Sequence, residues 1–214
     1  MAILALVGAR PDNAHAAFWT AGYYPAYRQG YYPPSAIDFS ALTQVIHFSV
    51  MPQVDGTLDP TGNALTSEDS VDLVSHAHAA GKQVLLCVGG ALSQAGFQGA
   101  TSDAILTGFV NNLMNFVSTY GYDGVDVDWE PLEDSDVVPF TNFINQLRAR
   151  LNSLTPHGLL TVATASQPGL FASLQSTFDQ INLMTYDLAG PWPGWVTWFN
   201  SPIFDGGYRF PSTG

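Results

Sequence analysis

Short apolar runs alternate with amphipathic segments along most of the chain. Strand-like composition, rich in β-branched and aromatic residues, occurs at residues 17–24, 44–50, 83–88, 123–130, 159–165 and 180–187. Helical spacing of apolar positions occurs at 67–80, from about 102 to 121, at 137–154 and, more briefly, at 170–177. The run at 83–88 is almost continuously apolar, which is typical of a strand buried on both faces. This alternation predicts an α/β fold with a parallel sheet.

One of these strands, residues 123–130 (DGVDVDWE), carries a cluster of acidic side chains. Because side chains alternate between the two faces of a strand, Asp126, Asp128 and Glu130 share one face and the apolar residues between them share the other. Crowded and buried carboxylates raise one another's pKa values. We therefore expect at least one of these carboxyl groups to hold its proton near neutral pH, as a general acid requires.

Other polar or glycine-rich positions also follow strands directly. Gly89 and Gly90 close the run at 83–88, and Tyr186 and Asp187 close the run at 180–187. In a (β/α)₈ TIM barrel the active site lies at this carboxyl edge of the strands. A complete barrel takes about 250 residues and eight strands, whereas the pattern here predicts about six β/α units. The expected architecture is therefore an incomplete TIM barrel that lacks its last two strands.

Charge and composition narrow the choice of partners. The 214 residues include 18 acidic and 6 basic side chains, for a net charge of −12. Such a surface repels nucleic acid and anionic membranes, so neither is an expected partner. No apolar run reaches the roughly 20 residues of a membrane-spanning helix. The single cysteine, Cys87, lies in a buried strand and is interpreted as a small core residue. His76 and His78 are two residues apart on a predicted helix, so they face different directions and predict no metal site.

The first residues are set apart from the predicted barrel. Residues 1–16 contain a short apolar run and the triplet Ala14-His15-Ala16, but no basic segment precedes them. They are either the remnant of a signal peptide or a weakly packed extension. Residues 17–214 are then the partial barrel and catalytic domain.

Four motifs in matching order resemble glycoside hydrolase family 18, in particular its bacterial-type chitinases. They are the D-x-x-D-x-D-x-E motif of 123–130, M-x-Y-D at 184–187, Gly22-Tyr23-Tyr24 and Gly89-Gly90. Together they extend the resemblance over about residues 17–214. The sequence departs from the family pattern where Cys87 replaces a serine and Ala91 replaces an aromatic residue. The segments that resemble the last two strands, with a tryptophan at the floor of the sugar site, are also missing, so the sequence is interpreted as truncated after the sixth strand.

The resemblance implies an endo-acting chitinase that hydrolyses β-1,4-linked N-acetylglucosamine polymers with retention of configuration. Glu130 would be the general acid, and the acetamido group of the substrate, not a protein side chain, would be the nucleophile. Asp128 and Tyr186 would hold that acetamido group, and Asp126 would adjust the charge of Asp128. The remaining site residues that the resemblance implies line the sugar subsite: Asp187, Met184, Tyr23 and Trp192. No cofactor is implied, and the protein would be secreted.

Two other functions stay open at this point. A truncated barrel could bind chitin with little or no turnover, and similar residues serve endo-β-N-acetylglucosaminidases that act on N-glycans. An incomplete barrel also leaves two bare strand edges, and such edges pair readily with another chain. We therefore expect either a homodimer through the exposed barrel edges or coverage of an edge by the tryptophan-rich segment that follows residue 188.

Overall fold

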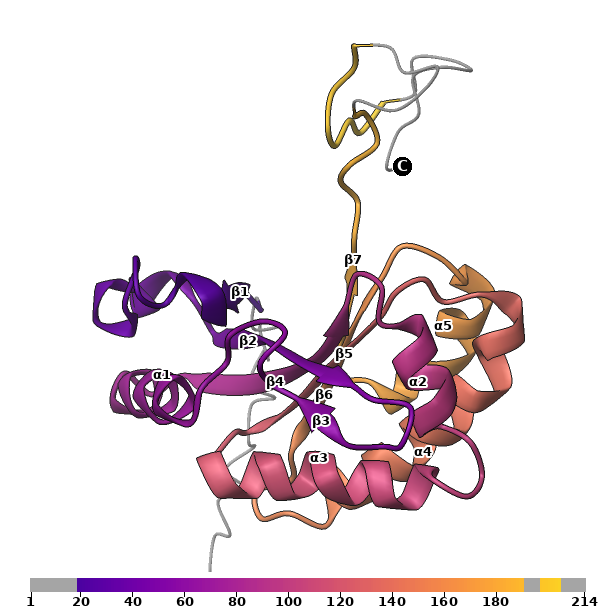
Figure 1. Cartoon of the computed structure of the whole chain (residues 1–214). Coiled ribbons are helices and arrows are strands. Elements are labelled where there is room, and N and C mark those ends of the chain that lie inside the picture. The colour runs from indigo at the N-terminus through magenta and orange to yellow at the C-terminus, as the bar shows by residue number, and fades with distance from the viewer. Residues whose placement is uncertain (1–18, 191–196, 205–214) are drawn as a thin grey trace, which may run out of the picture.

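The computed structural model describes residues 19–190 and 197–204, and its centre is a curved parallel sheet (Figure 1). The order of its strands is β1-β2-β4-β5-β6-β7, so each strand lies beside its parallel neighbour in sequence. A short strand, β3, pairs antiparallel with the end of β2. The strands are β1 (Ala21–Pro25), β2 (Gln44–Pro52), β3 (Leu58–Asp59), β4 (Gln83–Gly90), β5 (Gly124–Trp129), β6 (Leu159–Thr164) and β7 (Gln180–Leu183).

Helices connect the parallel strands and lie around the curved sheet, on the side away from its interior (Figure 1). They are α1 (Ser67–Ala79), α2 (Gln94–Ala100), α3 (Leu106–Tyr120), α4 (Val137–Asn152) and α5 (Pro168–Leu174). Short 3₁₀ helices occupy Ala26–Arg28, Pro34–Ala36, Phe39–Ala41, Asp134–Asp136 and Gln175–Thr177. This confirms the predicted fold class, an incomplete TIM barrel. Of the helices within the described residues, none is both long and apolar enough to span a membrane.

Two packed layers follow from the alternation of side chains along the strands. Between the sheet and the helices lies the larger core, to which β5 contributes Val125, Val127 and Trp129. There the indole of Trp129 stacks on Phe97 of α2, with 4.6 Å between the ring centroids. The opposite face of the sheet holds a smaller apolar cluster, made of Ile46, Leu85, Cys87 and Leu159. The acidic residues of β5 lie on this inner face.

Two differences from the predicted elements have clear causes. The strand predicted to reach residue 187 ends at Leu183, because the Thr185 amide turns back to bond the Leu183 carbonyl at 3.0 Å and Asp187 has a φ of 57°. Helix α2 was not predicted, because it is seven residues long and contains two glycines. One of them, Gly96, passes so close to β2 that a Cβ there would lie 2.0 Å from the Pro52 carbonyl oxygen.

At the N-terminal edge of the sheet, Asp123 links two neighbouring strands by a hydrogen bond. Before β5, Asp123 accepts a hydrogen bond from the Val84 amide of β4 at 2.7 Å and pairs with His78 at 2.9 Å. Asp123 therefore has a structural role, and its partners lie on β4 and α1. It belongs to the acidic motif of β5 but lies at the opposite edge of the sheet from Glu130.

Candidate active site

Asp126 lies at the middle of β5 and is completely buried on the inner face of the sheet. The Tyr23 hydroxyl of β1 donates to its Oδ2 at 2.9 Å, and the Thr161 hydroxyl of β6 donates to Oδ1. In the sheet register, Cys87, Asp126 and Thr161 are direct neighbours on three adjacent strands. Burial raises the pKa of Asp126, while hydrogen bonds from Thr161, Tyr23 and Cys87 act in the opposite direction. Three donors thus converge on one buried carboxyl group.

Asp128, two residues further along the same face, has a different environment. It is 5% exposed, and its Oδ1 is buried without a hydrogen-bond partner among the described residues. Burial, followed by the charges of Glu130 and Asp126, raises the pKa of Asp128 to about 8. Burial and the two neighbouring carboxylates therefore favour the protonated form of Asp128.

Glu130 follows the last residue of β5 and is held by its backbone. Its amide donates to the Ser93 hydroxyl at 3.0 Å, and that hydroxyl donates to the Asp128 carbonyl at 3.2 Å. The Gln94 amide, at the start of α2, donates to the Glu130 carbonyl at 3.2 Å. These bonds use only backbone groups of Glu130, so they fix the residue at the carboxyl edge of the sheet without engaging its carboxyl group.

The glycine pair at the end of β4 makes this arrangement possible. Gly89 and Gly90 have φ values of 106° and 114°, which side chains other than hydrogen rarely allow. A Cβ on Gly89 would lie 2.0 Å from the Asp128 carbonyl oxygen, and one on Gly90 would lie 2.6 Å from the Phe48 ring. Gly89 therefore lets β4 approach β5 at the level of the carboxylates, and Gly90 leaves room for the Phe48 ring of β2.

Tyr186 lies close enough to Asp128 and Glu130 for their charges to affect the pKa of its hydroxyl group. Burial, then the charges of Asp128, Glu130 and Asp187, raise the pKa of Tyr186. The side chain is 52% exposed on the segment that follows β7. The structure thus brings Tyr186 into the electrostatic environment of Asp128 and Glu130.

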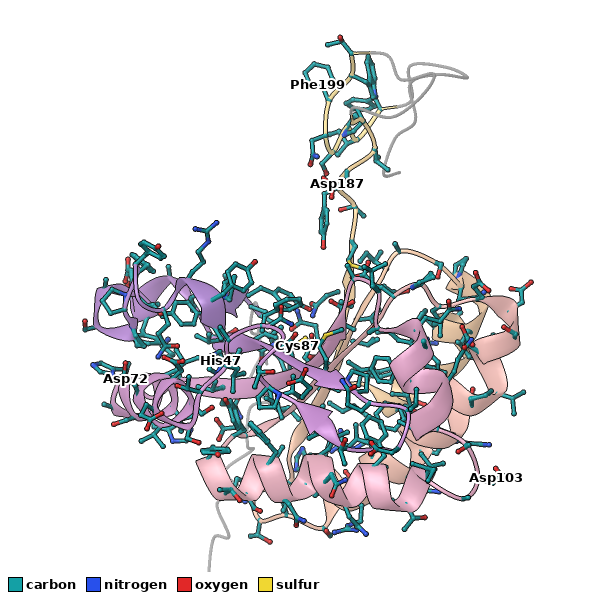
Figure 2. The ribbon with its side chains drawn as sticks, viewed as in Figure 1. His47, Asp72, Cys87, Asp103, Asp187 and Phe199 are labelled. Carbon is teal, nitrogen blue, oxygen red and sulfur yellow. The ribbon has the colours of Figure 1, made fainter. Side chains whose placement is uncertain are left out.

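The other residues of the predicted sugar subsite are more dispersed. Asp187 lies on the segment that leaves the sheet, whereas Cys87 lies inside the curve (Figure 2). The Asp187 carboxylate accepts from the Asn200 amide at 2.9 Å. Tyr23 is 41% exposed although its hydroxyl bonds Asp126. Trp192 lies outside the described residues.

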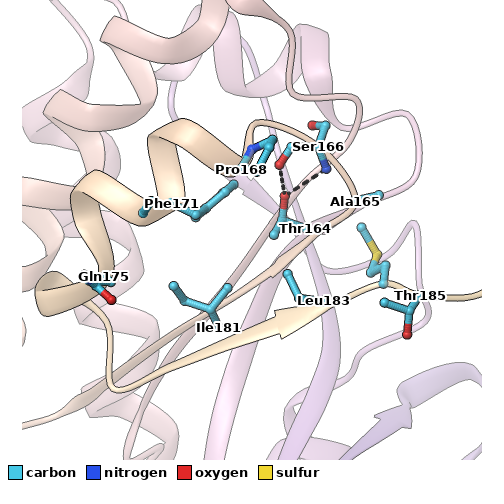
Figure 3. Close-up of a pocket in the computed structure, with 11 residues that line it drawn as sticks. Thr164, Ala165, Ser166, Pro168, Phe171, Gln175, Ile181, Leu183 and Thr185 are labelled. Atoms are coloured by element: carbon cyan, nitrogen blue, oxygen red, sulfur yellow. Dashed lines mark hydrogen bonds between the residues drawn. The ribbon is translucent and has the colours of Figure 1, made fainter. Parts of the chain in front are cut away.

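A cavity of about 490 Å³ lies between α5 and β7 (Figure 3). Its walls include Phe171 of α5 and two residues of β7, Ile181 and Leu183. These two residues alternate with Gln180 and Asn182, which contact residues on the inner face of the sheet. Met184 also borders this cavity. The cavity therefore lies behind the sheet and is separate from the Asp126–Glu130 carboxylates.

Three residues at the site were not identified from the sequence. Thr161 donates to Asp126, Ser93 links the backbones of Asp128 and Glu130, and Asn182 contacts the Tyr23 hydroxyl. A polar threonine in the otherwise apolar run at 159–163 was a usable signal for Thr161. The other two contacts depend on how β7 and the loop after β4 are placed, which strand periodicity does not specify.

Comparison with known proteins identifies the family to which this arrangement belongs. Residues 20–213 match the family described as Glycosyl hydrolases family 18. The chain belongs to glycosyl hydrolase family 18. The resemblance inferred from the acidic motif of β5 and the M-x-Y-D motif is thereby confirmed.

Similar proteins include two chitinases. The chain is 29% identical to chitinase B of Serratia marcescens, over 75% of this chain and 38% of that protein. It is 35% identical to a probable endochitinase of Caenorhabditis elegans, over 57% of this chain and 22% of that protein. The chain thus spans well under half the length of these relatives.

Solved structures show the same fold. The catalytic domain 2 of the Group II chitinase of Ostrinia furnacalis superposes with a TM-score of 0.76 at 23% identity, over 92% of this chain and 57% of that chain. A family 18 chitinase of Cycas revoluta, solved in complex with (GlcNAc)₃, gives a TM-score of 0.75 at 21% identity, over 87% of this chain and 60% of that chain. At this identity the likeness concerns the fold, and the chain spans somewhat more than half of each of these two structures.

Proposed function

We propose that this protein is an endo-acting chitinase that hydrolyses β-1,4-linked N-acetylglucosamine polymers. The observation that carries the proposal is the ladder of Asp126, Asp128 and Glu130 on one face of β5 in a family 18 chain. The ladder combines a buried carboxyl group, a neighbour with a pKa of about 8, and a half-exposed carboxyl group at the edge of the sheet. This combination supports proton delivery at neutral pH.

In the proposed reaction Glu130 gives a proton to the glycosidic oxygen. The carbonyl oxygen of the substrate's own acetamido group attacks the anomeric carbon as the bond to the leaving sugar breaks. A water molecule, deprotonated by Glu130, then opens the cyclic intermediate from the face that the leaving group vacated. Two displacements at one carbon retain its configuration, and this scheme is an exception to the usual pair of enzyme carboxylates.

Neighbouring groups would support the two displacements. Protonated Asp128 can donate to the acetamido group, and when Glu130 loses its proton Asp128 can share its own. Tyr186 keeps its hydroxyl proton, because its pKa is raised, and can donate to the acetamido oxygen. Met184, Asp187, Tyr23 and Trp192 remain the proposed sugar-contacting residues. Since chitin is an extracellular polymer, a secreted protein is expected.

The assay compares wild type with Glu130→Gln on a fluorogenic chito-oligosaccharide. The amide keeps the shape of Glu130 but has no acidic proton, so we expect a fall in kcat of about 100-fold or more. Glu68→Gln, the same change on the exposed first turn of α1, is the matched control and should keep wild-type rates. Equal rates for wild type and Glu130→Gln would remove Glu130 from the mechanism.

A chitin-binding protein with little turnover is the second candidate. Among the described residues, β1 and β7 each pair on one side only, so the sheet does not close around the carboxylates. Titration calorimetry with N-acetylglucosamine oligomers, run beside product analysis, separates the two functions. Heat of binding with no product from the wild type would favour the binding protein, and product from a glycoprotein but not from chitin would indicate an N-glycan substrate.

A further inference from the structure

A row of amide side chains crosses the interior of the curved sheet and ends at Asp126. The Gln44 amide of β2 donates to the Gln180 carbonyl oxygen at 3.1 Å, and the Gln180 amide donates to Asn182. The Asn182 amide then donates to the Tyr23 hydroxyl oxygen at 3.3 Å, and that hydroxyl donates to Asp126 at 2.9 Å. Every link therefore runs in the same direction, toward the buried carboxyl group.

The row joins strands that are far apart in the sheet. β4, β5 and β6 lie between β2 and β7, so Gln44 and Gln180 meet across the concave interior, not through strand pairing. Gln44 is 1% exposed, and a buried amide must be hydrogen-bonded to avoid a large desolvation cost. Burial thus favours the hydrogen bond between the Gln44 and Gln180 amides.

The direction of the row follows from the chemistry of its members. An amide has a donor end and an acceptor end, so fixing the Gln44 donor fixes the orientation of Gln180 and, through it, of Asn182. The Tyr23 hydroxyl has a single proton. Because its oxygen accepts from Asn182, that proton is left to point at Asp126. Burial and the charge of Asp126 also raise the pKa of Tyr23, so the proton stays on the hydroxyl.

We propose that Gln44, Gln180 and Asn182 are positioning residues that direct the Tyr23 proton to Asp126, and that they thereby keep the negative charge on Asp126 and the proton on the Asp128–Glu130 pair. The inference rests on the proposed function only for its consequence in catalysis. Donors aligned in series polarise one another, so each link strengthens the final bond to the carboxylate.

Several charged or titratable groups surround Asp126, and they affect which of the neighbouring carboxyl groups carries a proton. Tyr23 faces it from β1, Cys87 from β4, and Asp128 and Glu130 from β5 itself. A negative Asp126 disfavours a second negative charge on Asp128, whose pKa of about 8 reflects burial and then the charges of Glu130 and Asp126. Weakening the row should therefore move the proton between Asp126 and Asp128 without touching either residue.

The test is a titration of the aspartate carboxyl groups by carbon-13 NMR, which requires no turnover. In Asn182→Leu the Tyr23 hydroxyl loses its donor, and we expect the more acidic macroscopic pKa of the Asp126–Asp128 pair to rise by about 0.5 to 1 pH unit. Gln180→Met removes the preceding link and should shift the same pKa upward by less. Unchanged values in both variants would overturn the proposal.

A double-variant cycle distinguishes this role from a general structural effect. Asn182 acts through the Tyr23 hydroxyl, so Asn182→Leu should produce no further shift in a Tyr23→Phe background. A full shift in that background would contradict the proposal. If the wild type shows no hydrolysis, the proposed function fails, yet the titration still tests the row, so the two failures are distinguishable. If the wild type is active, Asn182→Leu should shift the pH profile of kcat/KM by the same number of pH units as it shifts the pKa measured in the titration.

Discussion

His47 is a histidine that the fold keeps neutral. Its side chain is completely buried on β2, its Nδ1 lies 2.7 Å from the Tyr122 hydroxyl, and its Nε2 has no hydrogen-bond partner within the described part of the chain. Burial lowers the pKa of His47 to about 4, well below its ordinary value near 6.5. A proton that the unfolded chain accepts readily is therefore excluded from the folded one.

The sign of the resulting pH dependence follows from proton linkage. Between about pH 6.5 and pH 4 the unfolded chain binds more protons at His47 than the folded chain, so the contribution of His47 to stability decreases as the pH falls through this window. This contribution falls by about 2 kcal/mol between pH 7 and pH 5, whereas the raised pKa of Asp128 acts in the opposite direction over the same interval. Urea unfolding at the two pH values measures the sum of these contributions.

Comparison with variants isolates the contribution of His47. His47→Gln keeps a polar side chain but cannot titrate, so its stability should fall about 2 kcal/mol less than that of wild type over this interval. His157→Gln changes an exposed histidine and should keep the wild-type pH dependence. A parallel pH dependence in wild type and His47→Gln would show that His47 does not titrate as the fold requires.

At the scale of elements, one arrangement occurs twice at the N-terminal edge of the sheet: an aspartate that precedes a strand accepts a hydrogen bond from a backbone amide of the neighbouring strand. Asp179, just before β7, accepts from the Leu160 amide of β6 at 2.8 Å and from Arg148 of α4 at 2.8 Å. Asp123 does the same between β5 and β4. In barrels of this type the N-terminal edge of the sheet contributes to stability, whereas the opposite edge carries the catalytic residues. The two aspartates therefore stabilise the pairing of neighbouring strands at the edge of the sheet that is opposite Glu130.

Asp179→Ala should cost about 2 to 3 kcal/mol in the free energy of unfolding. It leaves the buried Leu160 amide without its acceptor and the Arg148 guanidinium, 14% exposed, without its counter-charge. Asp103→Ala, on an exposed loop (Figure 2), is the control and should stay within about 0.5 kcal/mol of wild type. Chemical denaturation measures both. If Asp179→Ala were as stable as the control, the contacts of Asp179 with the Leu160 amide and Arg148 would contribute nothing measurable to stability.

How far the sequence alone predicted these elements depends on the range of the forces involved. β5 was predictable because its alternation separates three acidic side chains from three apolar ones within eight residues. The Tyr23–Asp126 bond was not, because the residues are 103 positions apart and meet only through the curvature of the sheet. Likewise, no local pattern distinguishes Asn182, which contacts Tyr23, from an ordinary polar residue on an edge strand. Local periodicity therefore located the acid, but not the side chains that orient its neighbours.

For the whole molecule, the most consequential feature is the pair of open sheet edges. Within the described residues, β7 pairs only with β6, and Leu183 at its end is 66% exposed. Residues 184–190 and 197–204, the described residues after β7, do not cover it: the Leu188 amide bonds the Asn200 carbonyl at 3.0 Å, and the Ser201 hydroxyl bonds the Thr185 carbonyl. The described part of this segment thus folds back on residues 185–188 and leaves the backbone of β7 available.

An uncovered edge strand with an exposed leucine invites pairing with a second copy of the chain. We predict a concentration-dependent dimer in solution, measured by light scattering coupled to size-exclusion chromatography. Leu183→Lys should shift this equilibrium toward the monomer, because a charged side chain on an edge strand opposes pairing. Ile203→Lys introduces the same charge at a residue that is 70% exposed but outside the sheet, and it should leave the equilibrium unchanged. A monomeric wild type at every concentration would contradict pairing through β7, and equal dissociation by both substitutions would show that the interface is not specific to β7.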